Sequence, residues 1–272
     1  MFRIKSGIAG IACLSTCLVG CGGSSGSGSM TPPPNASLVG LWAGTDANSG
    51  FPVTAIIDSA GNLVVIRSDG LQFVGDLQIA GNTIAATLSG YANFGRSFPD
   101  TGDIYGIGTL NGSAATAESI SAAVSFTTVT TSTPVPGSWT LTPDAASGVP
   151  SALSDVTGNF AVVSPGVSAA PPVDSLSITA AGLMSGQGST TGCLLQGTIS
   201  TPDTAINEYA VSYTISGCTA NYAVLNGVTF SGLGFANYAT SPATLTLAVR
   251  GTATTDAMNG IDFGIISALT PI

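Results

Sequence analysis

Short apolar runs separated by turn residues extend over almost the whole chain from Leu38 onwards. Runs rich in Val, Ile, Thr, Leu and Phe are interrupted every 8–12 residues by Gly, Asn, Asp or Pro. The segment Ile56–Ile66, for example, is strand-like on both sides of Gly61 and Asn62. No window keeps an apolar period of 3.6 residues through three helical turns. The sequence therefore predicts an all-β chain with little helix.

The two halves of this β sequence resemble each other. Five segments of the first half recur in the second at spacings that grow from 118 to 128 residues, as small loop insertions would produce. The matched pairs are Val39–Ala43 with Thr157–Ala161, Asp58–Gly61 with Thr179–Gly182, Gly75 with Gly197, Ser119–Val124 with Thr244–Val249, and Leu141–Pro143 with Leu269–Pro271. The repeat predicts two tandem units, residues 38–143 and 156–272, with Trp42 and Phe160 in equivalent places.

Each unit has about eight candidate strands. In the first unit they lie near residues 38–44, 52–58, 62–68, 71–79, 82–90, 104–111, 118–130 and 137–142. Closure into a barrel removes exposed strand edges, and eight strands make a small barrel with a filled or narrowly hollow interior. We therefore predict two tandem antiparallel up-and-down barrels, with a two-sheet β-sandwich as the alternative.

The beginning of the chain carries a pattern of another kind. Arg3 and Lys5 precede an apolar run of 12 residues, Gly7–Leu18, which is too short to cross about 30 Å of hydrocarbon as a helix. The run ends in Leu18-Val19-Gly20-Cys21. This segment resembles the signal peptide and lipobox of bacterial lipoproteins. The resemblance implies removal of residues 1–20 and attachment of a diacylglyceryl group and an N-acyl chain such as palmitate to Cys21, which together give lasting membrane attachment.

The same resemblance implies a place in the cell envelope. Gly22 follows the lipidated cysteine, and in the sorting rule of many Gram-negative bacteria a residue other than aspartate at this position favours the outer membrane. The protein would then face the periplasm or the cell surface. Residues 21–37 are rich in Gly, Ser and Pro and are expected to form a tether that holds the β units away from the bilayer.

Cys193 and Cys218 are the two cysteines that neither lie in the predicted signal peptide nor carry lipid. An even pair in an oxidising compartment forms a disulfide by default. Residues 193–200 and 208–217 predict a hairpin around the turn residues Thr201–Thr204, which would bring the two cysteines nearly opposite each other. We expect a structural disulfide.

The charge balance excludes one class of partner. Without residues 1–20 the chain has three arginines, Arg67, Arg96 and Arg250, against 14 acidic residues, a net charge of −11. Nucleic-acid binding depends on Lys and Arg contacts to phosphates, so no nucleic acid is expected. The expected partners are the membrane, through the lipid anchor, and an envelope protein, a polymer or a small apolar ligand.

The sequence offers little to a catalytic mechanism. It has no histidine, the usual general acid or base at neutral pH, and two cysteines without histidine do not make a zinc site. Asp100-Thr101-Gly102-Asp103 is better interpreted as a turn than as a catalytic pair. Asp46–Gly50 imitates the start of a calcium loop, but Ile57 stands where the glutamate ligand would be, so it too is interpreted as a turn. We predict a non-catalytic binding or structural protein without metal or cofactor, the alternative being a glycosidase-like envelope hydrolase that uses carboxylates alone.

Gly40-Leu41-Trp42 at the start of the first predicted strand resembles the G-x-W signature of the calycins, the superfamily of lipocalins and avidins. The resemblance implies a barrel with the tryptophan packed across one end. Trp42 and Trp139 are the only tryptophans, too few for the biotin pocket of an avidin. Both are expected to be core residues, with ligand contact as the alternative.

Overall fold

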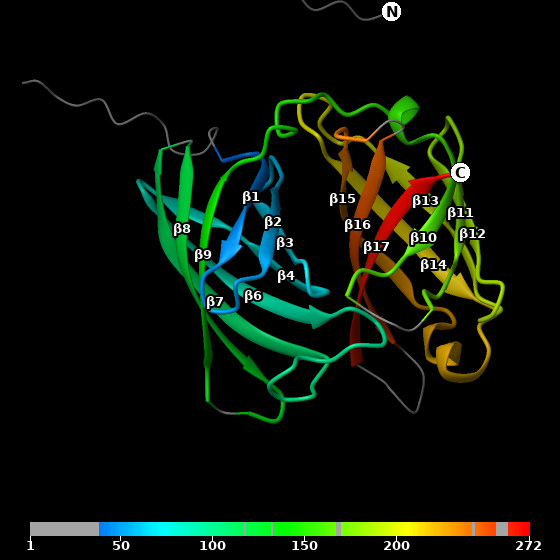
Figure 1. Cartoon of the computed structure of the whole chain (residues 1–272), viewed down its shortest axis with the longest axis horizontal. Helices are drawn as coiled ribbons and strands as arrows, with labels where there is room; N and C mark the ends of the chain where they lie inside the picture. The colour runs from blue at the N-terminus through cyan, green and yellow to red at the C-terminus, as the bar shows by residue number, and fades with distance from the viewer. Residues whose placement is uncertain (1–37, 117, 132, 167–169, 241–242, 254–260) are drawn as a thin grey trace, which may run out of the picture. The chain divides into compact units, whose positions relative to one another are not determined.

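The computed structural model describes residues 38–116, 118–131, 133–166, 170–240, 243–253 and 261–272. The predicted signal peptide, Cys21 and the tether, residues 1–37, lie outside the described residues. The regular structure in the described part is strand apart from two short 3-10 helices, η1 (Leu153–Val156) and η2 (Ala220–Leu225) (Figure 1). The prediction of an all-β chain is therefore confirmed. Both β units belong to one compact unit of the chain.

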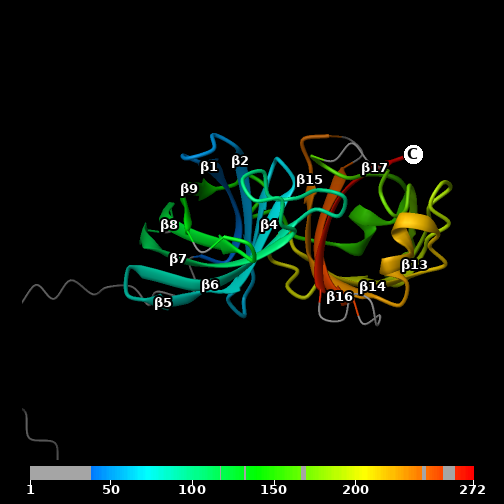
Figure 2. The ribbon, with the colours of Figure 1, turned by 90° about the horizontal axis from the view of Figure 1, so that it is seen from below.

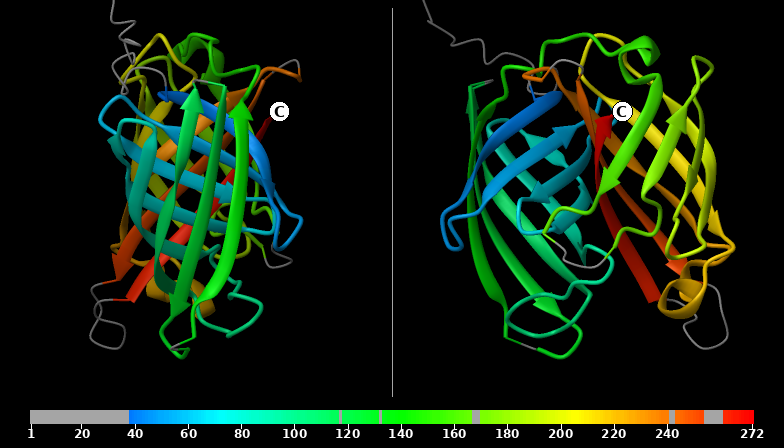
Figure 3. Two further views of the ribbon diagram at one scale, coloured as in Figure 1. Left: turned by 90° about the vertical axis from the view of Figure 1, so that its left-hand side faces the viewer. Right: turned by 45° about the vertical axis from the view of Figure 1, so that its right-hand side comes forward.

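The first β unit is an eight-stranded antiparallel barrel. The eight strands of the ring are β1 (Gly40–Asp46), β2 (Pro52–Ile57), β3 (Asn62–Arg67), β4 (Leu71–Asp76), β6 (Thr83–Ala92), β7 (Tyr105–Thr116), β8 (Ser119–Thr128) and β9 (Val135–Pro143), and a ninth, short strand, β5 (Gln78–Ala80), lies outside the ring. They pair in the order β4-β3-β2-β1-β9-β8-β7-β6, and β4 pairs with β6 to close the ring. The long strands β7, β8 and β9 stand side by side at the front of the left view in Figure 3. The short β5 also pairs with β6, so the single strand predicted over residues 71–79 is interrupted at Leu77, whose N–H turns to the carbonyl of Gly61.

The second β unit is a closed barrel of eight consecutive strands (Figure 2). They are β10 (Gly158–Val163), β11 (Ser175–Ile178), β12 (Leu183–Gln187), β13 (Leu194–Ser200), β14 (Tyr209–Ser216), β15 (Thr229–Asn237), β16 (Thr244–Ala253) and β17 (Ile261–Pro271). Each strand pairs with the next, and β10 pairs with β17. Two tandem barrels are thus confirmed, and the sandwich alternative is not adopted.

The strand registers confirm the repeat. Trp42 on β1 lies opposite Pro143 on β9, and Phe160 on β10 lies opposite Pro271 on β17. Both rings are buried, each with 2% of the residue exposed. The predicted equivalence of Trp42 and Phe160 therefore holds in the sheet and in the core.

The turn between the second and third strands is also repeated in detail. The N–H of Leu77 donates to the carbonyl of Gly61, and the N–H of Ile199 donates to the carbonyl of Gly182, both at 2.8 Å. The two glycines have φ of 88° and 76°, a conformation that favours glycine over residues with a Cβ. The Asp58–Gly61 and Thr179–Gly182 matches thus reflect the same turn chemistry.

Each barrel is filled by its own apolar core. In the first barrel both tryptophans belong to that core, as expected. The Trp42 Nε1–H donates to the carbonyl of Leu38 at 2.8 Å, which satisfies the indole donor that burial takes from water. In the second barrel the predicted hairpin is present as β13 and β14, and Cys193 and Cys218 form the predicted disulfide just beyond its paired residues, with Cα atoms 4.0 Å apart.

A third apolar cluster joins the outer faces of the two barrels. It contains Leu41, Ile56, Val64 and Ile66 from the first barrel and Leu233, Ala248 and Ile266 from the second. Gln72, which is fully buried, donates its amide to the carbonyl of Val249 at 2.8 Å. Strand β3 is therefore buried on both faces, which explains its continuous apolar run.

Asn93, just after β6, completes the edge of the second barrel. The β10–β17 ladder ends at Val163 and Ala268, so Ile266 lies beyond it. The Asn93 side chain accepts from the N–H of Ile266 at 3.0 Å and donates to its carbonyl at 3.2 Å. The next residue, Phe94, donates its N–H to the carbonyl of Gly264. The first barrel thus satisfies backbone groups that would otherwise be buried without partners.

We expect Trp42→Ala to lower the free energy of unfolding of the first barrel by about 3–5 kcal/mol, because it removes a fully buried aromatic ring and leaves a cavity. Urea unfolding followed by the fluorescence of Trp139, which lies in the same core, measures this change. Thr140→Ala on the exposed face of β9 is the control and should change the unfolding free energy by no more than about 0.5 kcal/mol. Equal effects of the two substitutions would contradict the role of Trp42 as a core residue.

Candidate functional site at the mouth of the first barrel

One end of the first barrel contains a small aromatic cavity, which we call the mouth. Its volume is about 60 Å³. The apolar wall includes Phe73 from β4, Phe126 from β8, Trp139 from β9 and Phe98 from the segment between β6 and β7. This cavity is the one place in the described interior of the barrel where several aromatic rings surround open space beside charged groups.

The four rings form a connected set. Phe73 lies edge-on to Phe126, with ring centroids 5.4 Å apart, and its ring is also 5.4 Å from that of Trp139. Phe98 packs against Phe126, with ring centroids 5.0 Å apart. Trp139 also lines a much smaller cavity of about 10 Å³ further inside the barrel. Trp139 therefore forms the floor of the mouth. It belongs to the core, as the sequence predicted, and it also lines the cavity, so the alternative of ligand contact stays a prediction.

The segment that carries Phe98 is held in place at both ends. Asn93 fixes its start to β17, as described above. Near its end, Asp103 accepts hydrogen bonds from the N–H and the hydroxyl of Thr130 at 3.0 and 2.7 Å. Hydrogen bonds from Thr128 and Thr130 lower the pKa of the Asp103 carboxyl. Between these points the N–H of Gly102 donates to the carbonyl of Phe98, so Asp100–Asp103 forms the predicted turn.

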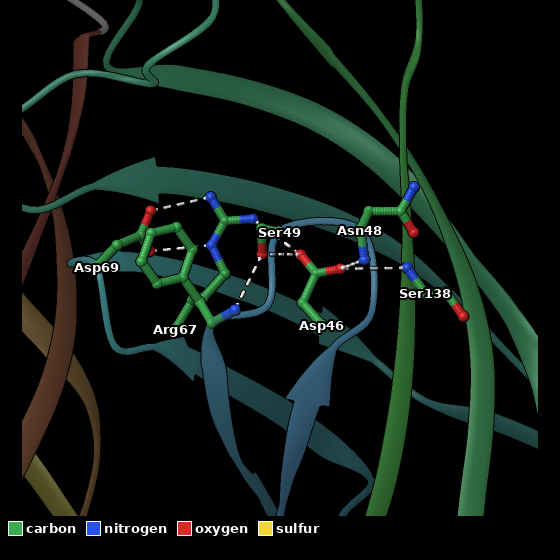
Figure 4. A network of polar contacts seen from close by, with 7 residues as sticks. Asp46, Asn48, Ser49, Arg67, Asp69 and Ser138 are labelled. Atoms are coloured by element: carbon green, nitrogen blue, oxygen red, sulfur yellow. Dashed lines mark hydrogen bonds and ion pairs between the residues drawn. The ribbon is translucent and has the colours of Figure 1, made fainter.

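A network of charged groups closes one side of the mouth (Figure 4). The Arg67 guanidinium at the end of β3 donates to both carboxylate oxygens of Asp69, at 2.9 and 3.1 Å. Its remaining amino group donates to Oδ2 of Asp46, at the end of β1, at 3.0 Å. The ring of Phe51 lies 5.6 Å from the guanidinium carbon. One arginine thus ties together the loops that follow β1 and β3.

Asp46 is the most fully engaged carboxylate of this network. Its Oδ1 accepts from the N–H groups of Asn48 and Ser138, and its Oδ2 accepts from the Ser49 hydroxyl as well as from Arg67. Burial alone would raise the pKa of Asp46, but these hydrogen bonds, led by that from Ser49, outweigh burial and lower it. Asp46 therefore stays ionised, and all four of its lone-pair directions are used.

Sequence reasoning found part of this site. It singled out Trp139 and interpreted Asp46–Gly50 as a turn, which is confirmed by the Gly50 N–H bond to the Asp46 carbonyl. It missed Arg67 and the rings of the wall. A usable signal was present, because Arg67 is one of three basic residues in the chain after Cys21 and sits at the end of a predicted strand.

The second barrel has no comparable mouth in its described part. Its interior cavity has a volume of about 10 Å³. An open depression of about 590 Å³ lies on its outer surface over β10 to β13, among uncharged polar side chains such as Ser175, Ser185 and Gln196. Its lining has no charged residue, and the one aromatic residue in that lining, Phe160, is buried in the core of the barrel.

Glu208, just before β14, is the other unusual titratable group. It is 2% exposed, and its Oε2 has no hydrogen-bond partner. Burial raises the pKa of Glu208 to about 7, with smaller contributions from the negative charges of Asp58 and Asp203. A raised pKa can mark a catalytic acid, but Glu208 lines none of the cavities described above. It is therefore assigned to the packing of the protein and not to the mouth.

No group of three or more potential metal ligands from His, Cys, Asp and Glu is found in the described part of the chain. None of its helices has the length and apolar character needed to cross a bilayer. In comparisons with family models, curated proteins and solved structures, none matched this chain.

The buried carboxyl of Glu208 predicts a specific pH dependence of stability. The folded-state pKa of Glu208, about 7, lies above the ordinary value of 4.5. The contribution of its protonated carboxyl to the free energy of unfolding is therefore complete below pH 4.5 and is lost as the pH rises to 7. The loss amounts to at most about 3 kcal/mol, at 1.36 kcal/mol per pKa unit. Glu208→Gln should remove this slope and make the protein more stable than wild type at pH 8.

Urea midpoints between pH 5 and pH 8 measure this difference. Asp76→Asn, at an exposed carboxylate of β4, is the matched control and should keep the wild-type slope. If Glu208→Gln also kept that slope, Glu208 would not hold its proton in the folded protein.

Proposed function

We propose that this chain is a non-catalytic, lipid-anchored protein of the bacterial cell envelope, whose first barrel binds a small ligand through the mouth. The lipobox at Cys21 supports the anchor, and Gly22 supports the outer membrane as its location. The calycin-like Gly40-Leu41-Trp42 is compatible with ligand binding at a barrel end. The ligand is expected to place an apolar group in the cavity that these rings line.

The observation that carries this proposal is the composition of the mouth. Four aromatic rings and a salt-bridged arginine converge on one cavity of about 60 Å³. Ligand sites are typically apolar hollows with a few precisely placed polar groups. The cavity is far smaller than the pockets of about 300–1,000 Å³ that enclose drug-sized ligands. It therefore suits one group of a ligand and not a whole large molecule.

The outer faces of the strands support anchoring by lipid. Along β8 the residues Ile120, Ala122 and Val124 are buried, whereas Ser121 and Ser125 face outwards and are exposed. A strand that crosses a bilayer carries the opposite pattern, with apolar side chains outside. Lipid on Cys21 would attach such a barrel without requiring the strands to enter the membrane.

The hydrolase alternative would require a carboxylic acid that keeps its proton beside the ligand. The pKa of Asp46, which lines the mouth, is lowered. Glu208, whose pKa is raised, lies away from the cavity. No observation favours this alternative over binding, and it is not proposed as a second function.

We expect Cys21→Ser to abolish lipidation and to leave the precursor uncleaved or aberrantly processed, because serine lacks the thiol that forms the thioether. Metabolic labelling with an alkyne-bearing fatty acid measures the lipid. Cys17→Ser, a substitution of the same kind within the predicted signal peptide, should leave labelling intact. Equal labelling of wild type and Cys21→Ser would contradict the anchor.

A cavity-filling substitution tests ligand binding. Gly137 on β9 lines the mouth, and a Cβ there would meet the side chains of Val124 and Asp46 at 3.5 and 3.7 Å, ordinary contact distances. Gly137→Val should therefore fill the mouth without straining the backbone. We expect toluene to bind the wild-type protein and to lose its affinity by at least about tenfold in the variant, as the pocket is occupied.

Binding is measured by titration calorimetry on the full processed chain. The control is Gly148→Val in the loop between the barrels, where a Cβ would meet nothing within 4 Å. This variant should bind toluene like wild type. The absence of toluene binding to the wild-type protein, or equal binding to Gly137→Val, would overturn the mouth as a ligand site.

A further inference from the structure

The walls of the mouth are suited to a positive charge. Phe73, Phe98, Phe126 and Trp139 all line the cavity, and their centroids lie 5.0–5.4 Å from those of their neighbours. The face of an aromatic ring attracts a cation held within about 6 Å of its centroid. A cationic group held in this small cavity would lie against the rings that line it.

The charges around the cavity have the matching sign. Its described lining holds two carboxylates, Asp46 and Asp100, and one cation, Arg67. The guanidinium of Arg67 is already shared between Asp46 and Asp69, so three carboxylates stand against one positive charge. A ligand anion would meet uncompensated negative charge, whereas a cation would reduce it.

The hydrogen-bonding state of the mouth narrows the kind of cation. Asp46 is the buried carboxylate of the lining, with 4% of its side chain exposed, and its two oxygens already accept four hydrogen bonds. A primary ammonium enclosed by the rings would find no free acceptor on Asp46, and its N–H donors would have to turn towards Asp100 at the exposed rim or towards solvent, since burying an unpaired donor is costly. A quaternary ammonium has no N–H and keeps its charge while presenting only methyl groups.

We propose that the mouth of the first barrel binds the head group of a quaternary ammonium compound, such as a choline-type trimethylammonium. This inference rests on the proposed function, because it names the ligand class of the same site. Aromatic rings would surround the methyl groups, and Asp46 and Asp100 would supply the opposite charge. The rest of the ligand would extend into solvent past Asp100, which is exposed.

A pair of ligands with the same shape tests the charge. Choline and 3,3-dimethyl-1-butanol differ in that a quaternary nitrogen replaces a quaternary carbon. We expect choline to bind about tenfold more tightly, as cation–π attraction predicts, and methylammonium to bind more weakly than choline. The readout is the fluorescence of Trp139 in the full processed chain carrying Trp42→Phe, so that the tryptophan in the mouth is the one observed.

Two substitutions, each with a control, test whether choline binds in the mouth. Gly137→Val should abolish the binding of both choline and the neutral alcohol, with Gly148→Val as its control. Asp100→Asn should lower the affinity for choline by about two- to threefold at low salt and by less at high salt. It should leave the affinity for the neutral alcohol unchanged. Asp76→Asn, an exposed carboxylate outside the lining, is the matched control for charge.

The outcomes separate this inference from the proposed function. If the alcohol binds as tightly as choline and Gly137→Val abolishes both, the quaternary ammonium proposal fails and the mouth remains a site for neutral apolar groups. Methylammonium binding as tight as that of choline would also overturn it. If choline, the alcohol and toluene all fail to bind, the proposed function fails with it.

Discussion

The arrangement of the two barrels depends on the backbone pairing that Asn93 makes with β17. Strand β10 is shorter than β17, so the ladder between them stops at Val163 and leaves Ile266, which pairs with Ala248 of β16 on its other side, without a strand partner on the β10 side. Buried peptide groups need partners, and the Asn93 amide supplies one donor and one acceptor to Ile266. The same residue begins the segment that carries Phe98 over the mouth. One side chain therefore links the open end of the β10–β17 ladder in the second barrel to the segment beside the mouth of the first.

Most of the fold could be predicted because the repeat records it twice. Turn glycines and the aromatic residue at the third position of the first strand recur in both halves, and the registers that pair Trp42 with Pro143 and Phe160 with Pro271 confirm the repeat. The hairpin between Cys193 and Cys218 was predictable for a similar reason, since a single turn connects its two strands. These are local features, or features that appear in two copies.

The interface and the mouth could not be predicted in the same way because they depend on single residues far apart in the chain. Arg67 meets Asp46 across 21 residues, and Gln72 meets Val249 across 177. These contacts exist once each and have no counterpart to reveal them. A partial signal was present in Leu63-Val64-Val65-Ile66, four consecutive apolar residues in one strand, because such a run indicates burial on both faces.

The repeat also separates what the fold requires from what the first barrel has added. The last pair of the β10–β17 ladder is Val163 with Ala268. Ser164, which follows Val163, therefore occupies the place of Asp46, and Ser267, which precedes Ala268, occupies the place of Trp139. In the first barrel Arg67 lies opposite Leu71. In the second barrel Gly188 occupies the place of Arg67, and its N–H donates to the carbonyl of Cys193, which occupies the place of Leu71. The end that forms the mouth in the first barrel is thus the end that the disulfide fastens in the second. Because the second barrel closes without an ion pair or a tryptophan there in its described part, those residues are not required by the barrel architecture, and the ligand binding that we propose would account for their presence together.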